Sequence, residues 1–183
     1  MNKKIFFSLQ LIMFSIMTFS TSVYADDTQL KAVTVEAISW MDKNKMQQQQ
    51  DEIKKLAKSK LGLDLHNNWD DIGLLQQIID RKLVATNDVS TQEAMGVILG
   101  NIMQADFPSH LQWKIYNDKV GRSKAICIKG TAECLFPVTM LSRRMRLEMQ
   151  INVAEIYDNA IAQAASKLPK VPYGDELLHR LTR

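Results

Sequence analysis

The sequence has 183 residues, of which 46% are hydrophobic and 23% are charged, and its formal net charge is +3. This length and apolar content fit one ordinary domain with its own hydrophobic core. The charge is too small for the concentrated cationic surface that phosphate contacts need, so we expect no nucleic-acid partner.

The first 25 residues have the pattern of a cleavable secretory signal peptide. Lys3 and Lys4 form a basic start, an apolar stretch follows over residues 5–19, and Val23 and Ala25 are the small residues that a signal peptidase accepts. The apolar stretch is shorter than the roughly 20 residues of a membrane-spanning helix. We therefore expect cleavage after Ala25, location in the periplasm and no stable membrane insertion afterwards, with an uncleaved anchor as the alternative.

Cleavage changes the charge of the working protein, residues 26–183, which we predict to be a single α+β domain. Because residues 1–25 contain two lysines and no Asp or Glu, their removal lowers the net charge from +3 by two, to +1. Near-neutrality and export both argue against roles that depend on ATP or nucleic acid.

Residues 28–60 carry apolar side chains three and four apart, which predicts one long helix or a lightly broken pair, ending at Gly62. The middle of this segment is polar and includes four glutamines at residues 47–50. We interpret the glutamines as a solvated helix face, with an interaction surface as the alternative.

Two further helices are expected before the first strand. One follows Trp69 and begins with Asp70 and Asp71. A catalytic pair of carboxylates would have to face the same way, which adjacent helical residues do not, so we interpret both residues as helix caps. The other opens on a capping box of Ser90 and Glu93. It carries Gly96 and Gly100 on one face, which favours close packing against another backbone.

Three short strands are predicted over residues 111–116, 124–129 and 133–137, forming an antiparallel meander. A turn at Gly130 places Cys127 directly opposite Cys134. Because exported proteins meet an oxidising environment, we expect a structural disulfide, with two buried free thiols as the alternative. The complete fold prediction is α+β, with four to five helices packed on a small three-stranded antiparallel sheet.

Three arginines, Arg143, Arg144 and Arg146, lie close together after the last strand, in a short helix expected to start at Thr139 or Ser142. Guanidinium groups bind carboxylate and phosphate bidentately, so these residues are a candidate anion or partner patch. A solvated helix face is the alternative interpretation. A last helix is expected after Asn152 and ends before Pro169.

No motif in the sequence indicates a catalytic, cofactor or metal site. Its three histidines, His66, His110 and His179, show no metal-ligand spacing, and no nucleophile elbow or phosphate-binding glycine loop occurs. We therefore name no catalytic residue, no metal ligand and no cofactor, and lean against an enzyme.

Four segments in the middle of the chain carry a family resemblance: residues 74–80, residues 95–100, Trp113 and residues 136–144. Together the stretch from about Ile72 to Met145 resembles the DUF3806 family, bacterial small domains without an assigned function. The resemblance implies a helix-plus-sheet α+β fold and transfers no catalytic residue. It covers under half of the predicted mature chain.

These features favour an exported domain that binds or inhibits a protein partner in the cell envelope, for instance an immunity protein against an envelope-targeting toxin. An envelope assembly or housekeeping factor is the alternative, and a hydrolase acting on envelope substrates is a third. The sequence does not determine the oligomeric state.

Overall fold

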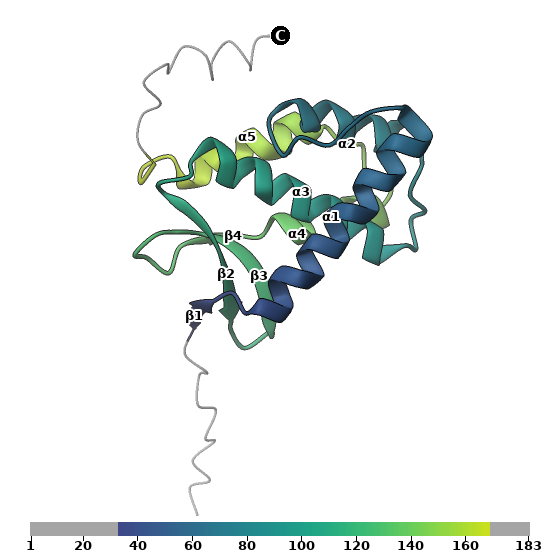
Figure 1. Cartoon of the computed structure of the whole chain (residues 1–183). Helices are drawn as coiled ribbons and strands as arrows, with labels where there is room; N and C mark the ends of the chain where they lie inside the picture. The colour runs from purple at the N-terminus through teal and green to yellow at the C-terminus, as the bar shows by residue number, and fades with distance from the viewer. Residues whose placement is uncertain (1–32, 169–183) are drawn as a thin grey trace, which may run out of the picture. The chain divides into compact units, whose positions relative to one another are not determined.

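A computed structural model describes residues 33–168, which form five α-helices and four β-strands (Figure 1). The predicted signal peptide and the C-terminal tail from Pro169 lie outside these residues. The helices are α1 (Trp40–Leu61), α2 (Asp70–Asp80), α3 (Val89–Asp106), α4 (Pro137–Arg146) and α5 (Val153–Ala164). The strands are β1 (Thr34–Ala37), β2 (Leu111–Asn117), β3 (Arg122–Ile128) and β4 (Cys134–Leu135). The α+β prediction is confirmed.

The sheet has four strands in the order β1-β2-β3-β4, all antiparallel, so the predicted count of three is wrong by one. The extra strand, β1, falls in the segment predicted to be helical. Thr34 pairs with Asn117 and Ala37 with Lys114. The strand with which β1 pairs lies about 80 residues away in the sequence. The spacing of apolar residues within residues 28–60 therefore did not indicate that part of this segment forms a strand.

Helix α1 begins at Trp40 because Ser39 caps it, its side chain accepting a hydrogen bond from the backbone N–H of Asp42. The helix runs without a break through the glutamines at residues 47–50 and ends at Gly62, which has a φ of 70° in the left-handed region. The predicted long helix and its glycine stop are therefore confirmed from Trp40 onwards, whereas residues 33–39 are not helical and residues 28–32 lie outside the described part of the chain.

The starts of the later helices depend on side-chain caps. Helix α3 begins at Val89, before the predicted cap Ser90. Its cap is Asp88, whose side chain accepts a hydrogen bond from the backbone N–H of Thr91. An aspartate two positions earlier thus replaces the predicted capping box. Helix α5 follows the prediction, since the Asn152 side chain accepts from the N–H of Glu155.

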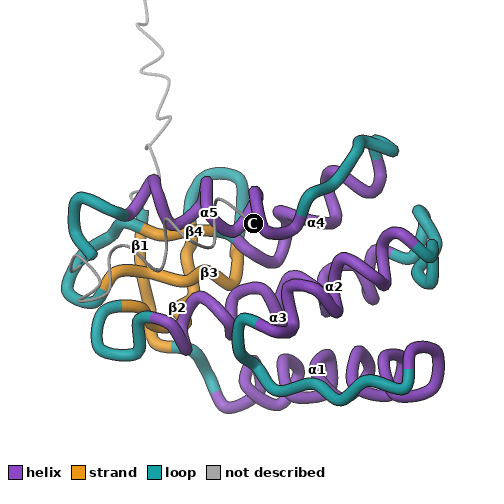
Figure 2. Tube along the Cα trace, turned by 90° about the horizontal axis from the view of Figure 1, so that it is seen from above, coloured by secondary structure: helices purple, strands orange, loops and turns teal. Residues whose placement is uncertain are grey.

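Helix α3 is the centre of the core. It lies between α1 and α4, with the strands gathered at one end of the three helices (Figure 2). Its side chains at Met95, Ile98, Leu99, Ile102 and Met103 are fully buried. Gly96 and Gly100 face α4 and Trp113 so closely that an added Cβ would lie 2.6 Å from the Val138 Cα or 2.3 Å from the indole ring. The predicted close approach of another backbone is confirmed at Gly96, whereas Gly100 packs against the side chains of Trp113 and Pro137.

Strands β3 and β4 are joined by a disulfide between Cys127 and Cys134. The two residues are direct partners in the register, as predicted, and Gly130 has the expected positive φ of 79°. The bond ties the short β4 to the sheet and fixes the point at which the chain enters α4. Within residues 33–168, no helix is both long enough and apolar enough to cross a membrane.

Candidate functional site

A cleft of about 530 Å³ opens between the first turns of α1, strand β3 and helix α4. We call it the charged cleft, because seven of the side chains that line it are ionisable. They are Asp42, Lys45, Glu93, Asp118, Arg122, Lys124 and Arg143. The rest of the lining is small or apolar, and includes Phe136 and Val138 where α4 begins.

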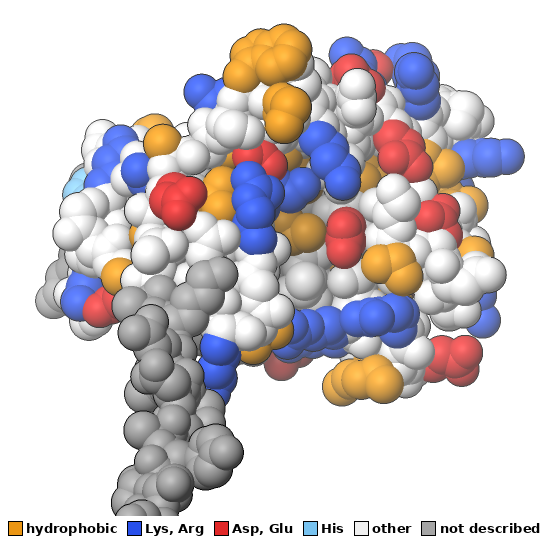
Figure 3. Space-filling model, turned by 90° about the horizontal axis from the view of Figure 1, so that it is seen from below, with side chains coloured by type: hydrophobic (Ala, Val, Ile, Leu, Met, Phe, Trp, Pro, Cys, Tyr) orange, Lys and Arg blue, Asp and Glu red, His pale blue; other side chains and the backbone are white. Residues whose placement is uncertain are grey.

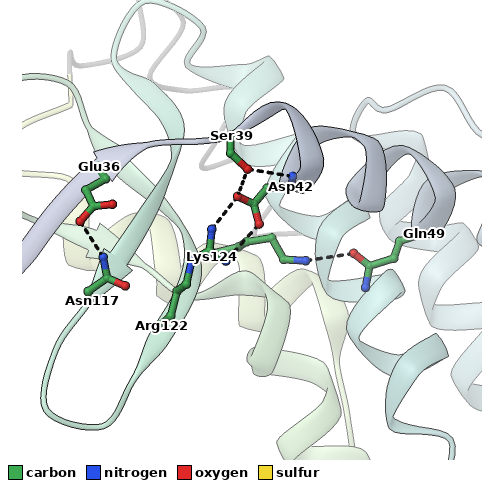
Figure 4. Close-up of polar contacts among 7 residues, drawn as sticks. All are labelled: Glu36, Ser39, Asp42, Gln49, Asn117, Arg122 and Lys124. Atoms are coloured by element: carbon green, nitrogen blue, oxygen red, sulfur yellow. Dashed lines mark hydrogen bonds and ion pairs between the residues drawn. The ribbon is translucent and has the colours of Figure 1, made fainter.

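One wall of the charged cleft is an ion pair between α1 and β3. The Arg122 guanidinium donates to both carboxylate oxygens of Asp42, at 3.0 and 2.6 Å, and the Ser39 hydroxyl donates to the same carboxylate (Figure 4). Hydrogen bonding from Arg122 lowers the pKa of Asp42 from 3.8 to about 2, against the opposing effect of burial. Asp42 and Arg122 therefore neutralise each other's charge and hold the start of α1 against the start of β3.

This pair predicts an acid-dependent contribution to stability. Because the Asp42 pKa is lower in the folded protein, the pair favours folding above pH 3.8, and the effect is lost as the pH falls towards about 2. Arg122 is half exposed, so screening should keep the contribution near 1 kcal/mol. We expect Asp42→Asn to lower the free energy of unfolding by about 1 kcal/mol at pH 7 and by less than half of that at pH 2. Denaturant unfolding at both pH values checks this, and an equal loss at both would contradict it.

Lys124 points from β3 into the charged cleft towards α1. Its ammonium is half-buried and donates to the side-chain oxygen of Gln49, 3.3 Å away (Figure 4). Burial lowers the pKa of Lys124, and the nearby Lys45 acts in the same direction, while Glu93 opposes both. A partly desolvated ammonium whose hydrogen bond is to a neutral amide gains more from an arriving anion than a fully hydrated lysine does.

Lys45, on α1, and Arg143, on α4, line the cleft together with Lys124. Both are exposed, and neither has a hydrogen-bond or ion-pair partner among the residues that the structure describes. Two of the three carboxylates that line the cleft already have partners. Asp42 binds Arg122, and Asp118 accepts hydrogen bonds from the backbone N–H groups of Val120 and Gly121. Glu93 is the remaining carboxylate. The cleft thus presents three cations from three elements to whatever enters it.

The three arginines singled out in the sequence do not act together in the structure. Arg143 lines the charged cleft, whereas Arg144 turns back and donates to the carbonyl oxygen of Met140 at 2.7 Å. Arg146 is exposed on the same helix and does not line the cleft. Of the predicted anion patch, only Arg143 lines the charged cleft with Lys45 and Lys124, and Arg144 and Arg146 do not.

Sequence reasoning missed Lys45 and Lys124, although a local signal was present. Asp42, Lys45 and Gln49 are three and four residues apart, so they share one face of α1. Arg122 and Lys124 are two apart and share one face of β3. The contact between these faces of α1 and β3 joins residues about 75 to 80 positions apart, and no local pattern in the sequence predicts it.

One face of the molecule carries charges of both signs. On the face shown in Figure 3, Lys and Arg side chains alternate with Asp and Glu side chains. Within residues 33–168 no group of three or more His, Cys, Asp or Glu side chains is placed to hold a metal ion. The charged cleft contains a partly desolvated lysine, Lys124, together with the cations of Lys45 and Arg143.

Residues 71–157 match the family model described as "Domain of unknown function (DUF3806)". The match confirms the resemblance predicted from the sequence. The matched segment supplies β2, β3, β4, α3 and α4, and so contributes Glu93, Lys124 and Arg143 to the charged cleft. Helix α1, with Asp42 and Lys45, lies outside it.

Among solved structures, the fold is similar to a crystal structure from Bacteroides thetaiotaomicron VPI-5482 determined at 1.50 Å resolution. The TM-score is 0.64 at 14% sequence identity, and the alignment covers 77% of this chain and 50% of that one. The two proteins therefore share a fold, and this chain spans about half the length of the structure that it matches. No curated protein matches the sequence significantly.

Proposed function

We propose that this chain is an exported binding domain that recognises an anionic segment of a protein partner in the cell envelope through the charged cleft. The observation that carries the proposal is the convergence of Lys45, Lys124 and Arg143, from α1, β3 and α4, on one cleft. Two of these cations lack a partner among the described residues, and the third is partly desolvated. Partner carboxylates would supply the missing counter-charges.

The cleft suits a segment of a larger partner better than a small free anion. Its cations come from three elements that line a cleft of about 530 Å³, and Phe136 and Val138 add apolar surface to the same lining. A mixture of apolar floor and charged rim is typical of protein interfaces, where charges set specificity and association rate. We propose an inhibitor, such as an immunity protein, as the form of this activity, with an envelope assembly factor as the alternative.

The location is part of the proposal and depends on residues 1–25. A basic start, a short apolar stretch and small residues before Ala25 support export to the periplasm. The Cys127–Cys134 disulfide is compatible with that compartment, since such bonds form and persist in oxidising environments.

Affinity capture with charge-reversed variants tests the proposal. The full chain, with a C-terminal tag, is expressed in its native cells, captured from the envelope fraction and analysed by mass spectrometry. We expect Lys45→Glu/Arg143→Glu to lose the protein that the wild type retains, with at least about a tenfold drop in recovery, because each reversal replaces an attraction by a repulsion.

Arg146→Glu is the control for the Arg143 half of this variant, since it reverses one arginine on the same helix outside the charged cleft. It should capture the partner as the wild type does. Equal recovery by the cleft variant and the wild type, at equal protein levels, would contradict the proposal. Absence of the chain from the envelope fraction would contradict the proposed location. A captured toxin would support the inhibitor form, and an envelope assembly component the alternative.

A further inference from the structure

A second cleft, of about 490 Å³, lies on the other side of α1 and is lined mainly by side-chain amides. We call it the amide cleft. Five amide side chains and one indole ring define it: Gln47, Gln50, Asn101, Gln104, Gln112 and Trp113. No carboxylate lines it. It is formed where α1, the C-terminal half of α3 and β2 meet.

The four glutamines at residues 47–50 divide between the two clefts. Gln49 is buried and accepts from Lys124 beside the charged cleft, whereas Gln47 and Gln50 line the amide cleft. Gln48 is exposed and lines neither. The prediction of a solvated face therefore describes only part of this run, and two of its members lie beside amides from α3 and β2.

Part of the amide cleft is held in place by a chain of hydrogen bonds. The Trp113 indole N–H donates to the Asn101 side-chain oxygen at 2.9 Å, and the Asn101 amide donates to Asn67 at 3.2 Å. These bonds fix the indole ring and one amide before any ligand arrives. Such preorganisation reduces the entropy that binding would otherwise cost.

Three other amides, Gln50, Gln104 and Gln112, are half-buried and have no hydrogen-bond partner among the described residues. Each offers a carbonyl oxygen that accepts and an NH₂ group that donates twice. Half-buried amides from three different elements are therefore available within one cleft, next to an ordered indole. Polar groups placed beside an aromatic side chain are able to fix the orientation of a ligand.

We propose that the amide cleft binds an oligosaccharide. Sugar hydroxyls both donate and accept, so they match side chains that do the same without carrying charge. The C–H faces of a sugar ring are apolar and suit contact with the Trp113 indole and with Met46. The absence of any carboxylate in the lining suits a neutral or weakly acidic chain, and Lys43 and Lys114 at the cleft are compatible with occasional acidic groups.

An extended peptide fits this cleft less well. A peptide that adds to a sheet edge needs a run of unpaired backbone groups and pockets for alternate side chains. Strand β1 pairs with β2 only from Lys114 to Asn117, which leaves residues 111–113 outside that pairing. This stretch is shorter than a typical strand of about five residues. The side-chain amides, rather than the strand edge, are therefore the main recognition groups.

Titration of the full chain with soluble oligosaccharides tests this site. The probes are tetramers of N-acetylglucosamine, glucose and galacturonic acid, with an alanine-rich hexapeptide for comparison, followed by calorimetry and by the NMR signal of the Trp113 indole N–H. We expect at least one oligosaccharide to bind with a Kd below about 1 mM and to shift that signal. Gln104→Ala/Gln112→Ala should weaken binding at least about tenfold, since two hydrogen bonds are lost.

Gln48→Ala is the matched control and should bind as the wild type does. Lys45→Glu/Arg143→Glu should also bind the sugar normally, so failure of the charged cleft and failure of this site are distinguishable. Loss of binding in Gln48→Ala, or unchanged binding in the double glutamine variant, would overturn the assignment. Binding of the hexapeptide alone, or of no probe, would overturn the proposed ligand class.

Discussion

Gly96→Ala is expected to lower the free energy of unfolding by about 2–3 kcal/mol, although alanine is the better helix former by about 1 kcal/mol. A Cβ at this position would lie 2.6 Å from the Pro137 carbonyl oxygen and from the Cα and carbonyl oxygen of Val138. All three atoms belong to the backbone of α4, so no side-chain rotation relieves the overlap. Helices α3 and α4 would have to separate, and the buried contact between them would be lost.

Gly73→Ala is the matched control for this prediction, because Gly73 lies on an exposed face of α2 with nothing within 4 Å of an added Cβ. It should raise the free energy of unfolding by about 0.5–1 kcal/mol. Denaturant unfolding of the three proteins gives both values. A Gly96→Ala protein as stable as the wild type would show that α3 and α4 do not pack as closely as described.

Asp71→Ala is expected to cost about 3 kcal/mol, the largest effect we predict for a charged residue. Asp71 is 1% exposed, and its carboxylate accepts from the backbone N–H groups of His66, at 3.1 Å, and Asn67. Hydrogen bonds to a charged acceptor are worth about 1.5–3 kcal/mol each, and their loss leaves two backbone donors without a partner. The connector between α1 and α2 should loosen before the rest of the protein unfolds.

The adjacent Asp70 provides the comparison. It is exposed at the start of α2, so Asp70→Ala should cost less than about 1 kcal/mol, mainly through the helix dipole. Hydrogen exchange of the His66 and Asn67 amides, measured with denaturant unfolding, separates a local from a global effect. Similar losses in the two variants, or unchanged exchange in Asp71→Ala, would contradict the assigned role of this carboxylate.

Local rules predicted those parts of the fold that depend on neighbouring residues. The cap at Asn152, the stop at Gly62 and the opposition of Cys127 and Cys134 follow from patterns a few residues long, and the structure confirms them. Asp70 and Asp71 do not cap α2, whose start has no side-chain cap, and α4 starts at Pro137, before the expected Thr139 or Ser142. Two further prediction errors have different causes. Strand β1 exists through pairing with a strand about 80 residues away, and the cap of α3 at Asp88 was masked by an equally good motif at Ser90.

The charged cleft was much less predictable than the fold. Its cations lie on α1, β3 and α4, and only Arg143 stood out in the sequence, because it has two arginine neighbours. Lys45 and Lys124 belong to no charge cluster or motif that singles them out, and the partial burial that distinguishes Lys124 exists only once β3 packs beside α1. Sites assembled from long-range contacts leave only weak local signals, such as the shared faces of a helix or a strand.

The central claim is that the charged cleft is the surface that contacts a protein partner in the cell envelope. Placing a photo-reactive phenylalanine analogue at Ser123, which is exposed and lines the cleft, measures this contact directly in living cells. The account predicts a cross-linked envelope protein from Ser123, its loss in the Lys45→Glu/Arg143→Glu background, and no cross-link from the analogue at Gln48. A cross-link from Gln48 alone, or one from Ser123 that survives the charge reversals, would contradict it.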